Sequence, residues 1–178
     1  AVAKTHGPEA VREAAEAGDP LAQTNLGVVY ERGIGVASDL LAARRWYLAA
    51  ARQGETQALA NYSSLPKHPD APPAIGAQHA EGLRELARGG NVEAMVLLAI
   101  TLIRTRGRAG NAAALPWLER AYAQKNPRAA LLLGQLLSRG SPPEIRRDLL
   151  RARECLEAAA RDPSLRSQAH RALQALPE

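Results

Sequence analysis

The sequence of 178 residues contains no phenylalanine, one cysteine and only 3% aromatic residues. A single cysteine, Cys155, cannot form an internal disulfide, so packing alone must stabilise the chain. The longest apolar stretch, residues 95–103, is interrupted by Thr101 and is far shorter than the roughly 20 residues of a membrane-spanning helix. These shortages exclude a disulfide scaffold, and no membrane span is expected.

Hydrophobic residues make up 46% of the chain and charged residues 23%, which is the composition of a globular protein. Alanine and leucine dominate the apolar residues, and both form helices readily. The formal net charge of +5 is uneven, since residues 1–100 carry 9 basic and 11 acidic side chains and residues 101–178 carry 14 and 7. We therefore expect an all-α protein whose basic C-terminal half can steer an acidic partner.

Internal repeats are visible as markers spaced by 35 or 36 residues. The markers are Gly18, Gly54, Gly90, Lys125 and Arg161. Apolar residues follow each of the first four markers at helical spacing, which predicts that every repeat opens with a helix. A second helix closes each repeat, so the architecture predicted is four helical hairpins between two end helices.

The first repeat, residues 18–54, shows this design best. Its first helix is predicted over about 21–31, and Gly33 and Gly35 end it because glycine accepts a left-handed backbone. Asp39 is suited to cap the second helix. In that helix Trp46 stands between small residues and is predicted to fill the space between helix layers.

The second repeat is irregular, because the prolines between Pro66 and Pro73 shorten its first helix and delay the next. Gly82 stands where tryptophan is expected.

Overall we predict a single domain over residues 1–178. It comprises an end helix (8–17), repeats at about 18–53, 54–89, 90–124 and 125–161, and a capping helix (164–176).

The first repeat resembles the Sel1-like repeat, a relative of the tetratricopeptide repeat. The matching residues are Gly18, Asp19, Ala22, Asn25, Leu26, Gly27, Tyr30, Gly33, Gly35, Val36, Asp39, Ala43, Trp46, Tyr47, Ala50, Ala51 and Gly54. The second repeat departs from the pattern, and the third and fourth lack the Gly-x-Gly turn. The resemblance implies an α-α superhelix, a right-handed solenoid acting as a non-enzymatic protein-interaction adaptor.

Candidate binding residues are those that the packing of repeats does not need. Projection of the first helices on a helical wheel turns several apolar or polar side chains away from the buried stripe: Val28, Val96, Ile100, Ile103, Leu131 and Gln135. In a superhelix these line the concave side and form a groove floor for a partner. The alternative is that tight curvature or a neighbouring helix already covers them.

Two further groups are candidates. Arg147 and Arg151 share a helical face at i, i+4 spacing, which suits a carboxylate or phosphate surface, although solvated arginines are the alternative. Lys67 and His68 stand in the proline-stiffened loop, which either presents a contact epitope or is a decayed repeat.

Signs of catalysis or cofactor binding are weak. The four histidines are scattered without metal-ligand spacing, so we expect no metal and no cofactor. Ser64 and Lys67 match a Ser-x-x-Lys pattern by accident, since Pro66 between them opposes the required helix. Cys155 stands at the tryptophan position of the fourth repeat and is interpreted as a core residue. Nucleic-acid binding is not expected, because stacking aromatics are missing among the basic residues.

The resulting expectation is a monomeric adaptor that binds a protein partner, acidic in character, through its concave surface. One form of this is a bacterial immunity or accessory protein for an effector. The alternative is a structural component of a cell-envelope or polysaccharide-export assembly. The first residue is Ala1 rather than methionine, which fits a mature exported protein or a fragment and favours the periplasm or envelope over the cytoplasm.

Overall fold

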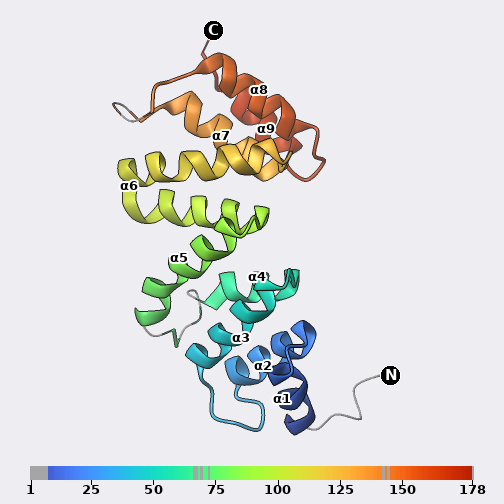
Figure 1. The fold of residues 1–178 in the computed structure, drawn as a ribbon. Coiled ribbons are helices and arrows are strands. Elements are labelled where there is room, and N and C mark those ends of the chain that lie inside the picture. The colour runs from blue at the N-terminus through green and yellow to red at the C-terminus, as the bar shows by residue number, and fades with distance from the viewer. Residues whose placement is uncertain are drawn as a thin grey trace. The chain divides into compact units, whose positions relative to one another are not determined.

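The computed structural model describes residues 8–65, 68, 70, 71, 73–141, 143 and 145–177. Within these residues every named element is an α-helix (Figure 1). The helices are α1 (Pro8–Glu16), α2 (Pro20–Arg32), α3 (Leu40–Arg52), α4 (Thr56–Ser64), α5 (Pro73–Arg88), α6 (Val92–Ala123), α7 (Pro127–Arg139), α8 (Leu149–Ala160) and α9 (Arg166–Gln174). The prediction of an all-α protein is confirmed.

The chain divides into two compact units, residues 1–89 (unit 1) and residues 90–178 (unit 2). In unit 1, α2 packs against α1 and α3, and α3 also packs against α4 and α5. In unit 2, α7 packs against α6 and α8, and α9 packs against α8. The division lies at the Gly90 marker, between the second and third repeats. No helix in the described parts is both long enough and apolar enough to cross a membrane.

The markers are turns that link one repeat to the next. Gly18, Gly54 and Gly90 have φ values of 98°, 91° and 94°, and Lys125 has a φ of 61°. The residue after each of these four markers caps the following helix: Asp19, Glu55, Asn91 and Asn126 each accept a hydrogen bond from a backbone N–H of the first turn. A left-handed residue followed by a capping side chain therefore turns the chain within two residues.

The turn inside a repeat is built differently in repeats one and four but closes in the same way. Gly33 and Gly140 end α2 and α7 with positive φ. The N–H of the capping aspartate of the next helix then donates to the carbonyl three residues before that glycine, Asp39 to Tyr30 at 2.9 Å and Asp148 to Leu137 at 3.1 Å. In repeat four an antiparallel bridge between Ser141 and Ile145 accommodates the longer turn.

The third repeat lies within α6. The backbone of Gly107 is non-helical (φ 53°, ψ −128°), so two helical segments meet there. Figure 1 shows them as an antiparallel pair. One glycine in a left-handed conformation thus replaces the Gly-x-Gly turn of the first repeat.

Close contact between a glycine and a bulky side chain joins the two helices of a repeat. A Cβ atom on Gly27 would lie 2.5 Å from the Tyr47 ring, and one on Gly134 would lie 2.7 Å from Leu156 Cγ. Tyr47 and Leu156 are fully buried. Trp46, which was predicted to fill the space between helix layers, is half-buried and packs against a cluster from α1 and α2. Its neighbour Tyr47 is the residue that faces Gly27.

The second repeat reverses this arrangement. Here the bulky residue, Tyr62, is on the first helix, and the glycine, Gly82, is on the second. The Tyr62 hydroxyl donates to the His79 carbonyl at 3.2 Å, and the two rings stack with centroids 4.9 Å apart. Gly82 at the expected tryptophan position therefore makes room for a tyrosine from the facing helix.

His79 is buried, and burial together with the nearby positive charge of Arg44 lowers its pKa from 6.5 to about 4. The folded protein therefore keeps this imidazole neutral, whereas the unfolded chain takes up a proton below pH 6.5. Stability linked to His79 is fully present above pH 6.5 and is lost as the pH falls toward 4.

The first testable prediction concerns this histidine. Between pH 6.5 and pH 4 the free energy of unfolding should fall by as much as about 3 kcal/mol more in the wild-type protein than in His79→Gln, since a pKa shift of one unit corresponds to about 1.4 kcal/mol. Urea titrations at a series of pH values measure the difference. Parallel pH profiles for the two proteins would contradict the assignment.

The second prediction concerns Lys125, which adopts a left-handed conformation where three markers have glycine. Lys125→Gly should raise the free energy of unfolding by about 1 kcal/mol, because a side chain at positive φ is strained. Gly18→Lys is the matched control and should lower stability by a similar amount, since space at Gly18 is open and only the backbone resists. Urea unfolding followed by circular dichroism tests both variants.

The third prediction concerns the contact between Gly134 and Leu156. Gly134→Ala should destabilise by about 1–3 kcal/mol through overpacking, and Leu156→Ala by about 2–5 kcal/mol through loss of buried volume. The double variant should lose less stability than the sum, because the truncated leucine leaves room for the new methyl group. Additive losses in the unfolding experiment would show that the two residues do not determine helix spacing.

Candidate protein-interaction surface

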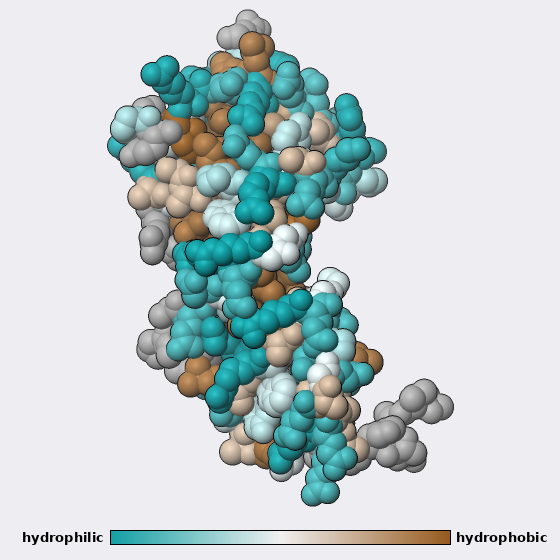
Figure 2. All heavy atoms as spheres, in the orientation of Figure 1, coloured by the Kyte–Doolittle hydropathy of each residue, from teal (hydrophilic) through white to brown (hydrophobic). Residues whose placement is uncertain are grey.

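Unit 2 exposes hydrophobic side chains among hydrophilic ones. Figure 2 shows this mixture over the part formed by α7, α8 and α9, which are orange to red in Figure 1. Two hollows lie here and share one residue, Arg147. Candidate residues that the sequence analysis placed in the C-terminal half line both of these hollows.

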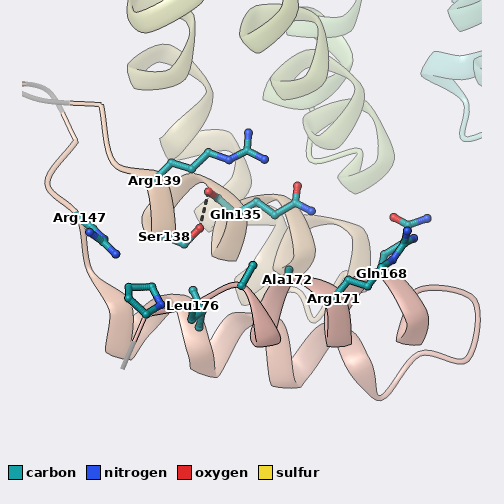
Figure 3. A pocket seen from close by; sticks show the side chains of 10 residues that line it. Gln135, Ser138, Arg139, Arg147, Gln168, Arg171, Ala172 and Leu176 are labelled. Carbon is teal, nitrogen blue, oxygen red and sulfur yellow. Dashed lines mark hydrogen bonds between the residues drawn. The ribbon is translucent and has the colours of Figure 1, made fainter.

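The first hollow, the α7–α9 pocket, has a volume of about 500 Å³. Spacing along two helices creates it: positions 135, 138 and 139 share one face of α7, and positions 168, 171 and 172 share one face of α9, whose C-cap is Ala175. Arg147 joins them from the segment before α8 (Figure 3). The full lining is Gln135, Ser138, Arg139, Arg147, Gln168, Arg171, Ala172, Ala175, Leu176 and Pro177.

The α7–α9 pocket is positively charged and contains no acidic residue in its described lining. Among the residues that the structure describes, Arg139 and Arg147 have no carboxylate partner, while Arg171 donates from Nε to the Ser167 carbonyl of its own helix at 3.3 Å. Three guanidinium groups with little internal compensation favour an anionic ligand group, since arginine binds carboxylates and phosphates with charge-assisted hydrogen bonds.

The second hollow, the α8 groove, lies at the N-terminal end of α8 and has a volume of about 640 Å³. Its lining is Leu115, Leu137, Ile145, Arg146, Arg147, Asp148, Leu149, Leu150 and Arg151. Leucine and isoleucine side chains come from three separate elements, and arginines flank them. Leu150 is 80% exposed, the largest exposed fraction among the bulky hydrophobic residues described.

The turn of repeat four positions Arg147 and α8. A Cβ atom on Gly140 would lie 3.1 Å from the backbone nitrogen of Arg147, which is a tight contact, and the positive φ of 66° also favours glycine there. Asp148 accepts a hydrogen bond from the Arg151 N–H at 2.9 Å, so its carboxylate serves as the N-cap of α8. Arg151 in turn pairs with Glu119 at 2.9 Å. The groove is thus anchored on both sides by backbone and ionic contacts.

The structure brings together three of the sequence candidates: Gln135, Arg147 and Arg151. Gln135 and Arg147 line the α7–α9 pocket, and Arg147 and Arg151 line the α8 groove. His68 is half-buried, with its Nδ1 accepting a hydrogen bond from the Asp70 N–H at 3.2 Å. Lys67 lies outside the described residues.

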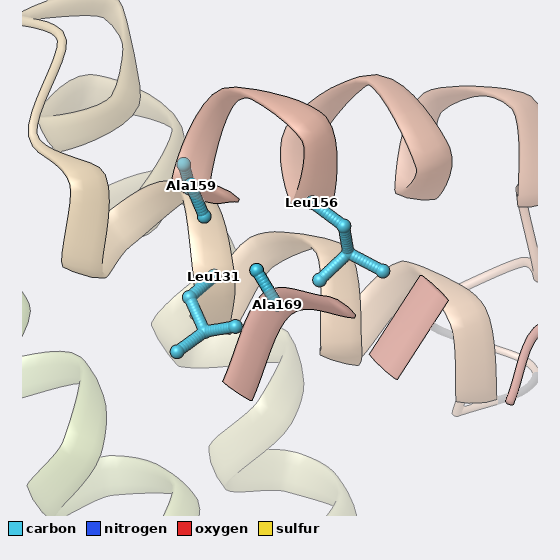
Figure 4. Packing of buried hydrophobic residues seen from close by; sticks show 5 residues of the cluster. Leu131, Leu156, Ala159 and Ala169 are labelled. Atoms are coloured by element: carbon cyan, nitrogen blue, oxygen red, sulfur yellow. The ribbon is translucent and has the colours of Figure 1, made fainter. Parts of the chain in front are cut away.

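The apolar groove floor expected from the helical wheel needs correction. Val96 is 0% exposed and Leu131 is 5% exposed, so the expectation that they are accessible is wrong. Leu131 packs in a core with Leu156, Ala159 and Ala169, because α8 and α9 cover that face of α7 (Figure 4). Ile100 and Ile103 in unit 2 and Val28 in unit 1 are half-buried.

Sequence reasoning missed Arg139, Arg171 and Leu150. Arg139 and Arg171 are 32 positions apart, and only the return of α9 along α7 brings them to one pocket. Leu150 had a signal: the Asp-Leu-Leu sequence at 148–150 repeats that at 39–41, and the second leucine of each follows a capping aspartate on the outer side of its helix. Its counterpart Leu41 is 37% exposed.

Within the described residues, no group of three or more histidine, cysteine, aspartate or glutamate side chains is placed to hold a metal ion. Cys155 is buried in α8, where burial raises the pKa of its thiol, with the Tyr122 hydroxyl nearby. A buried thiol of raised pKa is a poor nucleophile, so the placement of Cys155 agrees with its interpretation as a core residue.

The paired helices and their spacing define the chain as a helical-repeat protein. The model of the Sel1 repeat matches residues 20–55 and 127–163, which are the first and fourth repeats. The chain thus carries Sel1 repeats in both units, and the resemblance is confirmed. None of the curated proteins matches the chain. Sel1-repeat proteins generally mediate protein–protein interaction, and the family is one of non-catalytic scaffolds.

Solved structures share this fold. A Sel1 repeat protein from Oxalobacter formigenes is 22% identical, with a TM-score of 0.65 over 90% of this chain and 67% of that protein. A protective antigen of uropathogenic Escherichia coli that displays an SLR fold is 24% identical, with a TM-score of 0.64 over 86% of this chain and 32% of the antigen. The chain therefore spans about a third of the antigen's length, and both likenesses concern the fold alone.

The fourth prediction tests the burial of Cys155. In the native protein its thiol should react with an aromatic disulfide reagent roughly tenfold or more slowly than in urea, because both access and thiolate formation are suppressed. Absorbance of the released thiolate measures the rate. Equal rates in the two conditions would show that the thiol is accessible and would reopen a reactive role.

Proposed function

We propose that this chain is a protein-interaction scaffold that holds an acidic protein partner on unit 2. The observation that carries the proposal is the α7–α9 pocket, where Arg139, Arg147 and Arg171 surround a hollow that has no acidic residue in its described lining. The Sel1 repeats support a protein as the partner. An accessory or immunity protein that covers a bacterial effector is the biological form of scaffold that we favour.

Electrostatic attraction raises the rate at which this scaffold associates with an acidic partner and favours acidic partners over others. The whole basic excess of the chain falls in residues 101–178, so the field of unit 2 draws acidic surfaces toward the pocket. Screening limits this attraction to about 8–10 Å at physiological salt. Association should therefore slow as salt is added, and the arginines that line the pocket should contribute most once the partner has docked and excluded water.

The fifth prediction is a charge-reversal experiment on Arg139, Arg147 and Arg171. Changing all three to glutamate should lower affinity for the captured partner at least about tenfold, because each lost hydrogen bond between charged groups is worth about 1.5–3 kcal/mol. The partner is first isolated by affinity capture on the immobilised chain and then titrated in purified form by calorimetry at several salt concentrations.

The matched control reverses three exposed arginines of unit 1, Arg12, Arg32 and Arg45, which makes the same change in net charge. It should leave affinity nearly unchanged apart from a modest loss in association rate. Equal loss in the two triple variants would show that net charge rather than the pocket governs binding. An affinity independent of salt would show that binding does not depend on charge at all, and either result contradicts the proposal.

A further inference from the structure

We infer that the α8 groove and the α7–α9 pocket form one docking track, whose occupant is a segment of a protein partner with a large apolar side chain beside carboxylates. Arg147 lines both hollows and connects them. The inference rests on the proposed function, because it names the chemistry of the partner that unit 2 would hold. It adds that the apolar half of the docking track lies at the N-terminal end of α8.

The apolar half of the track is built around Leu150. Its side chain is 80% exposed, while Leu137 and Ile145 behind it are buried. Leu115 and Leu149 are half-buried and complete the wall. A leucine held this far out of the core beside a hollow lined with apolar side chains gains stabilisation when another apolar group covers it.

The charged half of the docking track determines the sign of the charge on the partner segment. Arg146 and Arg147 flank the groove, and in the part of the chain that the structure describes neither has a carboxylate partner. The one described acid in the lining, Asp148, is engaged as the N-cap of α8. Arg146 and Arg147 are therefore donors without a carboxylate acceptor in the described part of the chain, and charge complementarity selects carboxylates on the occupant.

Two features favour a protein segment over an anionic lipid surface. The α7–α9 pocket is the more enclosed of the two hollows, whereas a bilayer presents a broad face. The α7–α9 pocket also carries directional hydrogen-bonding groups, the amides of Gln135 and Gln168 and the hydroxyl of Ser138. Amide and hydroxyl groups of this kind match the backbone and side chains of an extended peptide. Stacking aromatics for nucleic acid are missing from the described lining of both hollows.

Unit 1 supplies an internal comparison. Leu41 occupies the position of Leu150, directly after a buried leucine and a capping aspartate, and it is 37% exposed. Its substitution changes the same kind of surface in the other unit. Leu41→Ser is therefore the matched control for Leu150→Ser, and thermal unfolding of both variants should lie close to the wild-type protein because neither side chain belongs to the core.

The experiment uses three fluorescent synthetic peptides and the full chain. The first peptide contains glutamate and serine around a pair of leucines, the second replaces the leucines with serine, and the third replaces the glutamates with lysine. Fluorescence anisotropy should show that the wild-type chain binds the first peptide about tenfold more tightly than the second and binds the third least.

The variants separate the two halves of the track. Leu150→Ser should reduce affinity for the first peptide to that for the second, whereas Arg147→Ala should weaken binding of both acidic peptides. Leu41→Ser should bind like the wild-type chain. A peptide preference unaffected by Leu150→Ser and Arg147→Ala overturns the inference. So does tight binding to vesicles of phosphatidylserine and phosphatidylcholine that Leu150→Ser abolishes while the peptides stay unbound.

The captured partner distinguishes failure of this inference from failure of the proposed function. If the partner still binds the Leu150→Ser variant with unchanged affinity and the charge-reversal variant weakly, the docking track is wrong and the scaffold function stands. If the charge-reversal variant binds the partner as tightly as the wild-type chain, the proposed function fails, and the docking track fails with it.

Discussion

In repeats one, two and four, the spacing between the paired helices depends on one kind of contact, a glycine packed against a bulky buried side chain. Tyr47 fills the space above Gly27, and Leu156 fills the space above Gly134. Any side chain at the glycine would overlap its neighbour, so the helices keep their close approach only while both members of the pair are present. This spacing in turn determines which residues are left for the surface.

The second repeat shows that the contact matters more than its place in the sequence. Tyr62 stands on the first helix and Gly82 on the second, the reverse of repeats one and four. The pairing of large with small is preserved, although the repeat has lost the regular pattern. The polar groups brought inside by this exchange are satisfied in part by the Tyr62 hydrogen bond to the His79 carbonyl, and His79 stays neutral because it is buried beside Arg44.

The surface of unit 2 that we propose as the binding surface lies beside the packed core. Gly140 permits a turn that brings the backbone of Arg147 close, and Asp148 then starts α8 with Leu149 and Leu150 in its first turn. The turn of repeat four thus forms backbone hydrogen bonds from Ser141, Ile145 and Asp148, and it lies next to an exposed leucine and to arginines without a carboxylate partner among the described residues. Residues that stabilise the array and residues available to a partner are neighbours in sequence but separate in role.

The sequence determined the helices, their turns and the repeat spacing, because left-handed glycines, capping side chains and helical periodicity act within a few residues. It also indicated Gln135 and Arg151, which lie on helices. The helical face predicted for Arg147 and Arg151 is wrong, because Arg147 precedes the N-cap Asp148 and lies outside α8. Only the tertiary structure decided the rest. Leu131 is a core residue because α8 and α9 cover it, and Arg139 and Arg171 line the same pocket because α9 returns along α7. Such contacts depend on the angles and distances between helices. These are determined by many packed side chains together, so they produce no local pattern in the sequence.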